Sequence, residues 1–208
     1  MNACCGAWRR CCATPEARRA EVERKSTETS VAVSVSLDGS GRSSVRTGVK
    51  FLDHMLTSLS FHSMVDIDVK ASGDLQHHLV EDVAIVLGQA LDRALGDRAG
   101  IRRFGHCIVP MDDALALAAV DLVKRPFSVV DLRLERVTVE DAPREDLEHI
   151  FPSLAESLRS TVHVKVLDGR NDHHKFEAAV KAFAMSFREA ASPDPSRKKA
   201  QPSSKGRM

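Results

Sequence analysis

One pattern of acidic and histidine residues occurs twice in this chain, and the duplication constrains the fold more than any other feature. In each copy an acid–histidine pair precedes a histidine doublet, and a glutamate follows the doublet three residues later. The first copy comprises Asp53-His54, His77-His78 and Glu81, and the second comprises Glu148-His149, His173-His174 and Glu177. The gap from the single histidine to the doublet is 23 residues in one copy and 24 in the other. This match predicts an internal duplication of one long unit.

The segments around these residues repeat as well. Hydrophobic residues alternate with polar ones over 65–69 and 162–166, and a glycine follows each run, which indicates a half-buried strand ending in a turn. After each doublet the hydrophobic spacing changes to the helical period. We therefore expect helices over 51–62, 78–95, 144–160 and 173–190, the second ending at Gly96.

Further strands complete each half. Residues 31–37 alternate and lead through a turn at 38–41 into a short partner strand at 43–47. The second half opens with strands at 106–109, 114–123 and 127–134. Each half is expected to be strand-strand-helix-strand-helix, so the predicted class is α+β, with helices covering one face of each sheet.

Composition divides the chain into four regions. Residues 1–24 are expected to be a dispensable extension, 25–97 the first half-repeat, 98–191 the second, and 192–208 a basic tail whose composition predicts disorder. The extension holds Cys4, Cys5, Cys11 and Cys12, but without a nearby histidine or regular structure it makes a poor metal cage. It resembles a transit-peptide remnant only weakly, so we expect a cytoplasmic protein, with a plastid as the alternative if it is one.

The net charge of +1 conceals an uneven distribution. Residues 1–25 carry +3 and residues 192–208 carry +4, which leaves −6 for the part between them. This balance fits a carboxylate-bearing site and argues against a nucleic-acid surface. No hydrophobic run approaches the ~20 residues needed to span a bilayer, so no membrane helix is expected.

The duplicated residues suit two metal ions. Residues three or four apart share a helix face, so either histidine of a doublet can approach the same ion as the following glutamate. The two adjacent imidazoles diverge by about 100°, so each doublet can serve two different ions. With His54 and His149 added, two sites of three histidines and one glutamate result. Such ligands suit Zn, Mn, Fe or Co, and a shell of four or five leaves room for substrate or water, as in a catalytic site.

A single His-His-x-x-Glu is more often surface polarity or a capped helix start than a metal site. Its recurrence with matched upstream histidines favours metal. His106 and His163 lie in predicted strands outside the pattern and are interpreted as ordinary strand residues. His62 lies eight residues after His54, within a turn of the same helical face.

Four segments resemble the imidazoleglycerol-phosphate dehydratase family: 51–55, 77–82, 100–105 and 170–184. The resemblance runs from about Lys25 almost to the C-terminus. It implies a ribosomal protein S5 domain 2-like fold and dehydration of D-erythro-imidazoleglycerol 3-phosphate to imidazole acetol phosphate, a lyase step of L-histidine biosynthesis. It further implies a pair of manganese ions per active site, and a homo-oligomer of twenty-four chains with each site built at subunit contacts.

The resemblance also implies roles for individual residues. Glu177, or its counterpart Glu81, would move the substrate proton. Arg103 and Arg125 would clamp the phosphate, although read alone they would be surface charges. The residues expected to complete substrate binding are Glu28, His62, Lys181, Ser203, Ser204 and Lys205.

The chain departs from the family in the turn before His77, which is shorter than usual, while all eight ligands are retained. Two other functions use the same ligand types. A non-catalytic metal-storage protein would be mostly helical and would give Arg103 and Arg125 no task. A binuclear metal hydrolase would share the ligands without needing a gap for an imidazole ring.

Overall fold

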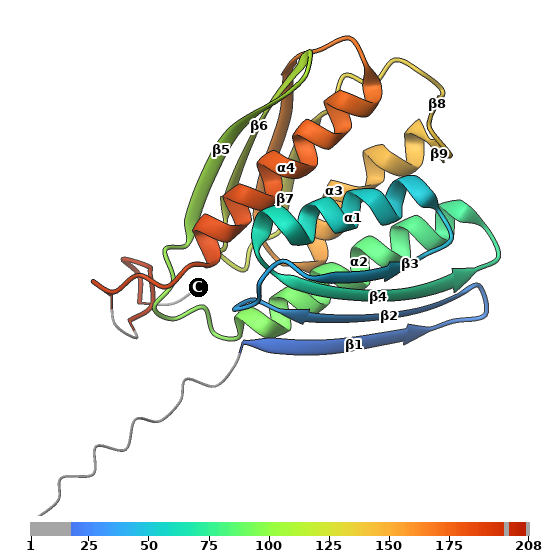
Figure 1. Cartoon of the computed structure of the whole chain (residues 1–208). Coiled ribbons are helices and arrows are strands. Elements are labelled where there is room, and N and C mark those ends of the chain that lie inside the picture. The colour runs from blue at the N-terminus through green and yellow to red at the C-terminus, as the bar shows by residue number, and fades with distance from the viewer. Residues whose placement is uncertain (1–17, 198–199, 207–208) are drawn as a thin grey trace, which may run out of the picture.

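The computed structural model describes residues 18–197 and 200–206. In these residues two four-stranded sheets enclose four helices, each helix packing on one sheet and on a helix of the other half (Figure 1). The first sheet has the order β1-β2-β4-β3 and the second β5-β6-β10-β7. The cysteines of the N-terminal extension lie outside the described residues.

The elements of the two halves follow one another in the same order. The first half consists of β1 (Arg19–Lys25), β2 (Thr29–Ser36), β3 (Ser43–Arg46), α1 (Lys50–Ser63), β4 (Asp66–Gly73) and α2 (Gln76–Leu95). The second consists of β5 (Phe104–Met111), β6 (Ala114–Asp121), β7 (Phe127–Asp131), α3 (Arg144–Ser157), β10 (Thr161–Asp168) and α4 (Asp172–Ala191). A small hairpin, β8 (Thr138–Val139) and β9 (Ala142–Pro143), precedes α3.

The predicted α+β class is therefore confirmed, with helices on one face of each sheet. In both sheets the last strand of the order pairs in parallel and the others antiparallel, so the two halves have one topology.

The first half, however, has three strands before its first helix, not two, whereas the three strands expected to open the second half are present as β5, β6 and β7, followed by the β8–β9 hairpin. The additional strand of the first half is β1, which overlaps the expected extension, so the boundary at residue 24 falls inside a strand. Only Val22 of β1 is buried, because β1 is an edge strand, and its sequence therefore shows no hydrophobic alternation.

The expected hairpin between residues 31–37 and 43–47 was wrong. β3 pairs in parallel with β4, and β2 is occupied on its two sides by β1 and β4. The Asp66 carboxylate at the start of β4 accepts hydrogen bonds from the backbone N–H groups of Ser40 (2.8 Å) and Arg42 (3.0 Å). These contacts carry the chain across β4 before β3 begins.

The core lies between the helices and joins the two halves. Helix α1 packs on α4 and α2 packs on α3, so these two helix pairs each join elements from different halves. Phe51 of α1 contacts Phe176 of α4, with ring centroids 5.8 Å apart. Burial of this shared apolar surface holds the duplicated units together.

The described part of the C-terminal tail is ordered by backbone hydrogen bonds, contrary to the expectation from its composition. Gly100 N–H donates to the carbonyl of Ala200 (2.9 Å), and Asp194 N–H donates to the carbonyl of Gly100 (2.8 Å). Composition does not reveal such pairing, because any residue type except proline supplies both groups.

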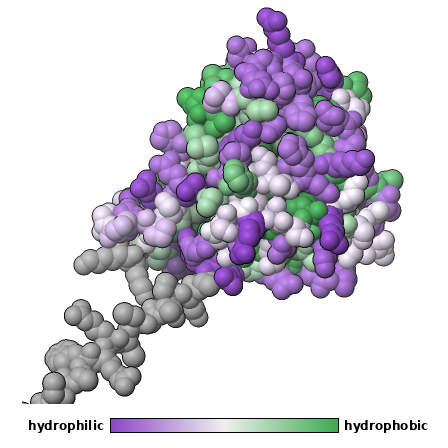
Figure 2. All heavy atoms as spheres, in the orientation of Figure 1, coloured by the Kyte–Doolittle hydropathy of each residue, from purple (hydrophilic) through white to green (hydrophobic). Residues whose placement is uncertain are grey.

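The face shown in Figure 2 is largely hydrophilic, with small hydrophobic clusters. Among the described residues, no helix has both the length and the apolar character that crossing a membrane requires.

Candidate functional site

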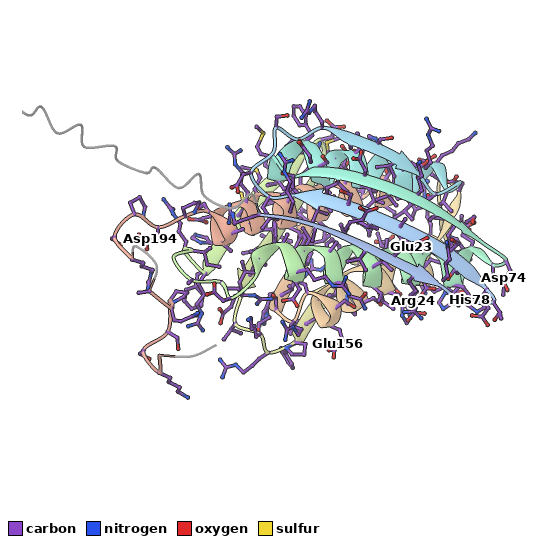
Figure 3. All side chains as sticks on the ribbon, turned by 90° about the horizontal axis from the view of Figure 1, so that it is seen from below. Glu23, Arg24, Asp74, His78, Glu156 and Asp194 are labelled. Carbon is purple, nitrogen blue, oxygen red and sulfur yellow. The ribbon has the colours of Figure 1, made fainter. Side chains whose placement is uncertain are left out.

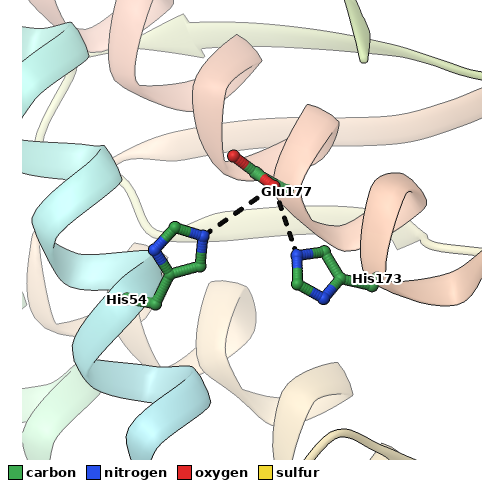
Figure 4. Close-up of side chains that lie close together, drawn as sticks. All are labelled: His54, His173 and Glu177. Carbon is green, nitrogen blue, oxygen red and sulfur yellow. Dashed lines mark ion pairs between the residues drawn. The ribbon is translucent and has the colours of Figure 1, made fainter. Parts of the chain in front are cut away.

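The contact between α1 and α4 brings three predicted metal ligands together (Figure 4). His54 lies on α1, and His173 and Glu177 lie one turn apart on α4; their ligand atoms are all within 4.8 Å of one another. Glu177 Oε2 lies 3.9 Å from His54 Nε2 and 3.3 Å from His173 Nε2. Two donor atoms bound about 2.1 Å from one ion at a tetrahedral angle are about 3.4 Å apart, so this group fits a divalent transition metal.

Lys181 and His62 border this group. Lys181 Nζ lies 2.9 Å from Glu177 Oε1. Burial raises the pKa of Glu177, but the hydrogen bond and charge of Lys181, with His54 and His173, outweigh it and leave the pKa below its ordinary value. Burial, aided by the Lys181 charge, lowers the pKa of His62. The group therefore holds an ionised carboxylate, and His62 favours its neutral form.

The contact between α2 and α3 produces a second histidine pair at the equivalent place. The rings of His77 on α2 and His149 on α3 have centroids 5.7 Å apart at 78°. Glu81 is half-buried and lies one turn after His77 on the same helix. In the part of the chain that the structure describes, only the His54–His173–Glu177 group brings three metal-ligand side chains within the 4.8 Å distance.

Each doublet histidine has its Nδ1 atom beside a carboxylate. The pairs are His77–Asp146 at 2.8 Å, His78–Asp74 at 3.1 Å, His173–Glu140 at 3.0 Å and His174–Asp113 at 2.5 Å. A carboxylate on Nδ1 accepts its proton and leaves the Nε2 lone pair free, which is the usual support of a metal-bound histidine. The four doublet histidines, each with a carboxylate at Nδ1, therefore fit a metal centre.

None of these four carboxylates was predicted from the sequence. Asp74 lies four residues before His78, beside it at the end of the first sheet (Figure 3), and this spacing was a usable signal. The other three come from elements distant in sequence, so only the fold reveals them.

The second histidine of each doublet lies outside the group formed by its own chain. His78 Nδ1 is 3.6 Å from Glu28 Oε2, and His174 Nε2 is 3.4 Å from Asp112 Oδ2. Glu28, expected to contact substrate, is thus placed beside a predicted metal ligand. The turns holding Glu28 and Asp112 are equivalent, since they join β1 to β2 and β5 to β6.

A cleft gathers the residues expected to bind phosphate. It is lined by Arg103, Val123, Lys124, Arg125, Ser203, Ser204 and Lys205. Arg103 donates to both carboxylate oxygens of Asp121 (2.6 and 3.0 Å) and to the carbonyl of Pro202 (2.9 Å). A guanidinium has five N–H donors, so two remain for a ligand.

Two further cations lie near these groups. Lys181, expected to complete substrate binding, contacts Glu177 in this chain and does not line this cleft. Lys124 lines the cleft and was not selected from the sequence, although its position next to Arg125 was a signal.

Comparison with known proteins gives the family. A model of the family described as imidazoleglycerol-phosphate dehydratase matches residues 47–187. The chain belongs to the imidazoleglycerol-phosphate dehydratase family. The matched region contains all eight predicted metal ligands of the dehydratase motifs, together with Arg103, Arg125 and Lys181.

Relatives that bear the dehydratase name match most of the chain. The one from Chlorobium luteolum is 52% identical over 180 residues, which cover 85% of this chain and 90% of the relative. The one from Cereibacter sphaeroides is 48% identical over 194 residues, which cover 92% of this chain and 100% of the relative.

Solved dehydratase structures share the fold. The Pyrococcus furiosus structure is 36% identical with a TM-score of 0.79, and the match covers 90% of this chain and 100% of that one. The Staphylococcus aureus structure is 34% identical with a TM-score of 0.78, covering 85% and 99%.

Proposed function

We propose that the protein is a hydro-lyase that dehydrates D-erythro-imidazoleglycerol 3-phosphate to imidazole acetol phosphate in L-histidine biosynthesis. Membership of the dehydratase family supports the activity. The observation that carries the proposal for this chain is the meeting of His54, His173 and Glu177 across two helices from different halves.

We propose two manganese ions per active site as the cofactor. The ligands would be the eight residues of the duplicated pattern: His54, His77, His78, Glu81, His149, His173, His174 and Glu177. Ligand type alone does not select manganese, so its choice rests on the family. When bound, such ions would supply Lewis-acid chemistry toward the substrate imidazole.

The chain's own groups would handle the remaining proton. Dehydration removes hydrogen from one carbon and hydroxide from its neighbour, and the resulting enol becomes the ketone. The carbon-bound hydrogen is weakly acidic, so a well-placed base is needed. Glu177 favours the ionised form beside Lys181 and can accept that proton at a carboxylate oxygen. Glu81 is its counterpart in the other half.

The cleft would hold the substrate phosphate away from the metals. Arg103 and Arg125 offer planar forks that match phosphate oxygens, and Lys205 adds a positive charge. Asp121 fixes the Arg103 fork through two hydrogen bonds. Ser203 and Ser204 line the same cleft and supply hydroxyl donors.

Several chains would complete each site, in a homo-oligomer of twenty-four subunits as the family resemblance implies. Three of the eight ligands gather closely within one described chain, whereas His78 and His174 pair with carboxylates outside that group. A neighbouring copy can supply such outward-facing ligands in a symmetric assembly.

The alternatives account for less of the structure. A storage protein gives no reason for a cleft that collects two arginines, two lysines and two serines. A mostly helical storage bundle also differs from two four-stranded sheets. A hydrolase leaves the family match unexplained.

The direct test combines activity, metal analysis and native mass. Manganese-loaded protein is incubated with imidazoleglycerol phosphate, and the enol–ketone product is followed by absorbance. Product formation by an assembled, metal-containing protein supports the proposal. Absence of product from such a preparation contradicts it.

A further inference from the structure

The first histidines of the two doublets have unequal support. His77 Nδ1 lies 2.8 Å from Asp146 Oδ1, and the Asp146 side chain is 1% exposed. His173 Nδ1 lies 3.0 Å from Glu140 Oε1, and that side chain is 57% exposed. The duplicated pattern thus places one imidazole against a buried carboxylate and its counterpart against a solvated one.

Asp146 is poorly explained as a stabilising residue. Its second oxygen, Oδ2, is buried and has no hydrogen-bond partner in the described residues. Burying a carboxylate with an unpaired oxygen costs free energy, and its position in the first turn of α3 recovers only part of that through the helix dipole. Among the side chains that the structure describes, Asp146 binds that of His77, a predicted metal ligand.

We infer that Asp146 is a positioning residue that orients His77 for a metal ion and makes this ion more tightly held than the ion served by His173. The inference rests on the proposed metal centre. By accepting the Nδ1 proton, Asp146 selects the tautomer whose Nε2 lone pair can bind the ion.

Burial explains why Asp146 should support its histidine as a metal ligand more strongly than Glu140 does. The negative charge of a buried carboxylate is weakly screened and strengthens the imidazole as a ligand, whereas water screens an exposed carboxylate and leaves it mobile. Asp146 also lies on α3 and His77 on α2, so the pair fixes the imidazole relative to His149 on the helix of the other half.

The test compares Asp146→Asn with the matched control Glu140→Gln. Both changes keep the size of the side chain and remove its charge, and an amide can rotate to present either a donor or an acceptor. Mn²⁺ binding is measured by titration calorimetry and elemental analysis on the full-length protein after chelator treatment. We expect Asp146→Asn to weaken one class of sites roughly 10- to 100-fold and Glu140→Gln to change either class by less than about threefold.

Thermal unfolding separates positioning from a purely structural role. Because Asp146→Asn removes a poorly paired buried charge, the metal-free variant should melt at the wild-type temperature or above it. The rise in melting temperature on adding Mn²⁺ should shrink. A lower metal-free melting temperature with unchanged Mn²⁺ affinity would show that Asp146 is structural and would overturn the inference.

Asp146→Glu tests the same point with the charge kept. It should hold Mn²⁺ more tightly than Asp146→Asn, and equal weakening in both would count against the role of the charge. If the wild type binds no Mn²⁺, the metal centre and this inference are both wrong. If the wild type binds two ions and Asp146→Asn binds both with wild-type affinity, only this inference is wrong.

Discussion

Lys181 Nζ lies 2.9 Å from Glu177 Oε1, one turn along α4, and so forms an ion pair with a predicted metal ligand. Glu177 is 7% exposed, so this cation compensates a nearly buried carboxylate. Because Lys181 contacts Glu177 and does not line the cleft that holds Arg103 and Arg125, we expect it to act on Glu177.

Lys181→Met should therefore act on turnover. Without its cation, the Glu177 carboxylate loses both position and charge compensation, and we expect kcat to fall by about tenfold or more with little change in KM. Lys181→Arg, which keeps the charge, should retain more of the activity. Steady-state kinetics measure both constants. A raised KM with unchanged kcat would indicate that Lys181 binds the substrate phosphate instead.

Arg103→Ala should weaken substrate binding. It removes charge-assisted hydrogen bonds to phosphate, and one such bond corresponds to roughly a tenfold rise in KM. Metal content should stay at the wild-type level, because Arg103 bonds to Asp121 and Pro202, which are not predicted ligands. Arg102→Ala, a change at the exposed residue next to Arg103, is the control. Loss of metal together with substrate binding would contradict the assignment.

Mixing of inactive variants should reveal shared sites. His54 belongs to the group within one chain, whereas His78 is proposed to serve a neighbour. His54→Asn and His78→Asn proteins should each be inactive. When the two are mixed, stripped of metal and reassembled with Mn²⁺, some sites receive both histidines and activity should return. Activity that stays absent in mixed assemblies would indicate that one chain supplies all the ligands.

Asp66→Ala should destabilise the fold in a pH-dependent way. Hydrogen bonds from the backbone N–H groups of Ser40 and Arg42, opposed in part by desolvation and aided by the Arg42 side chain, lower the Asp66 pKa. The ionised Asp66 carboxylate therefore stabilises the native state. This stabilisation is fully present above the unfolded pKa of about 3.9, and it is lost as the pH falls through the lower native pKa. We expect Asp66→Ala to lower the free energy of unfolding by about 1 to 2 kcal/mol at pH 7 and by less at acidic pH.

Thermal or denaturant unfolding of wild type and Asp66→Ala across this pH range measures the difference. Asp68→Ala, on the same strand, serves as the control. If the stability difference between wild type and Asp66→Ala grows as the pH falls, the expected direction of the pH dependence is wrong.

Elements that local hydrophobic periodicity determines could be predicted from the sequence, whereas features that depend on which strands pair could not. The four main helices could be predicted because hydrophobic residues recur at helical spacing on the faces that become buried. β1 could not, since an edge strand with only Val22 buried carries no alternation. The partner of β3 was assigned wrongly because a short turn favours a hairpin locally, while Asp66 redirects the chain in the fold.

The candidate site shows the same division. The repeated motif identified His54, His173 and Glu177 as ligands, and the structure brings them together. Asp146 and Glu140 were missed because each reaches its histidine from another element, at 69 and 33 residues' separation. No spacing rule on a single helix covers such distances.

The crossed packing of α1 on α4 and of α2 on α3 bears on the origin of the chain. A half-length ancestor would have lacked the partner helix for each histidine doublet, and could have formed these groups only as a twofold-symmetric pair of separate polypeptides. Fusion of the two genes would then have made that pairing permanent and freed the halves to diverge, as Asp146, three residues before His149, and Phe51, three residues before His54, have done.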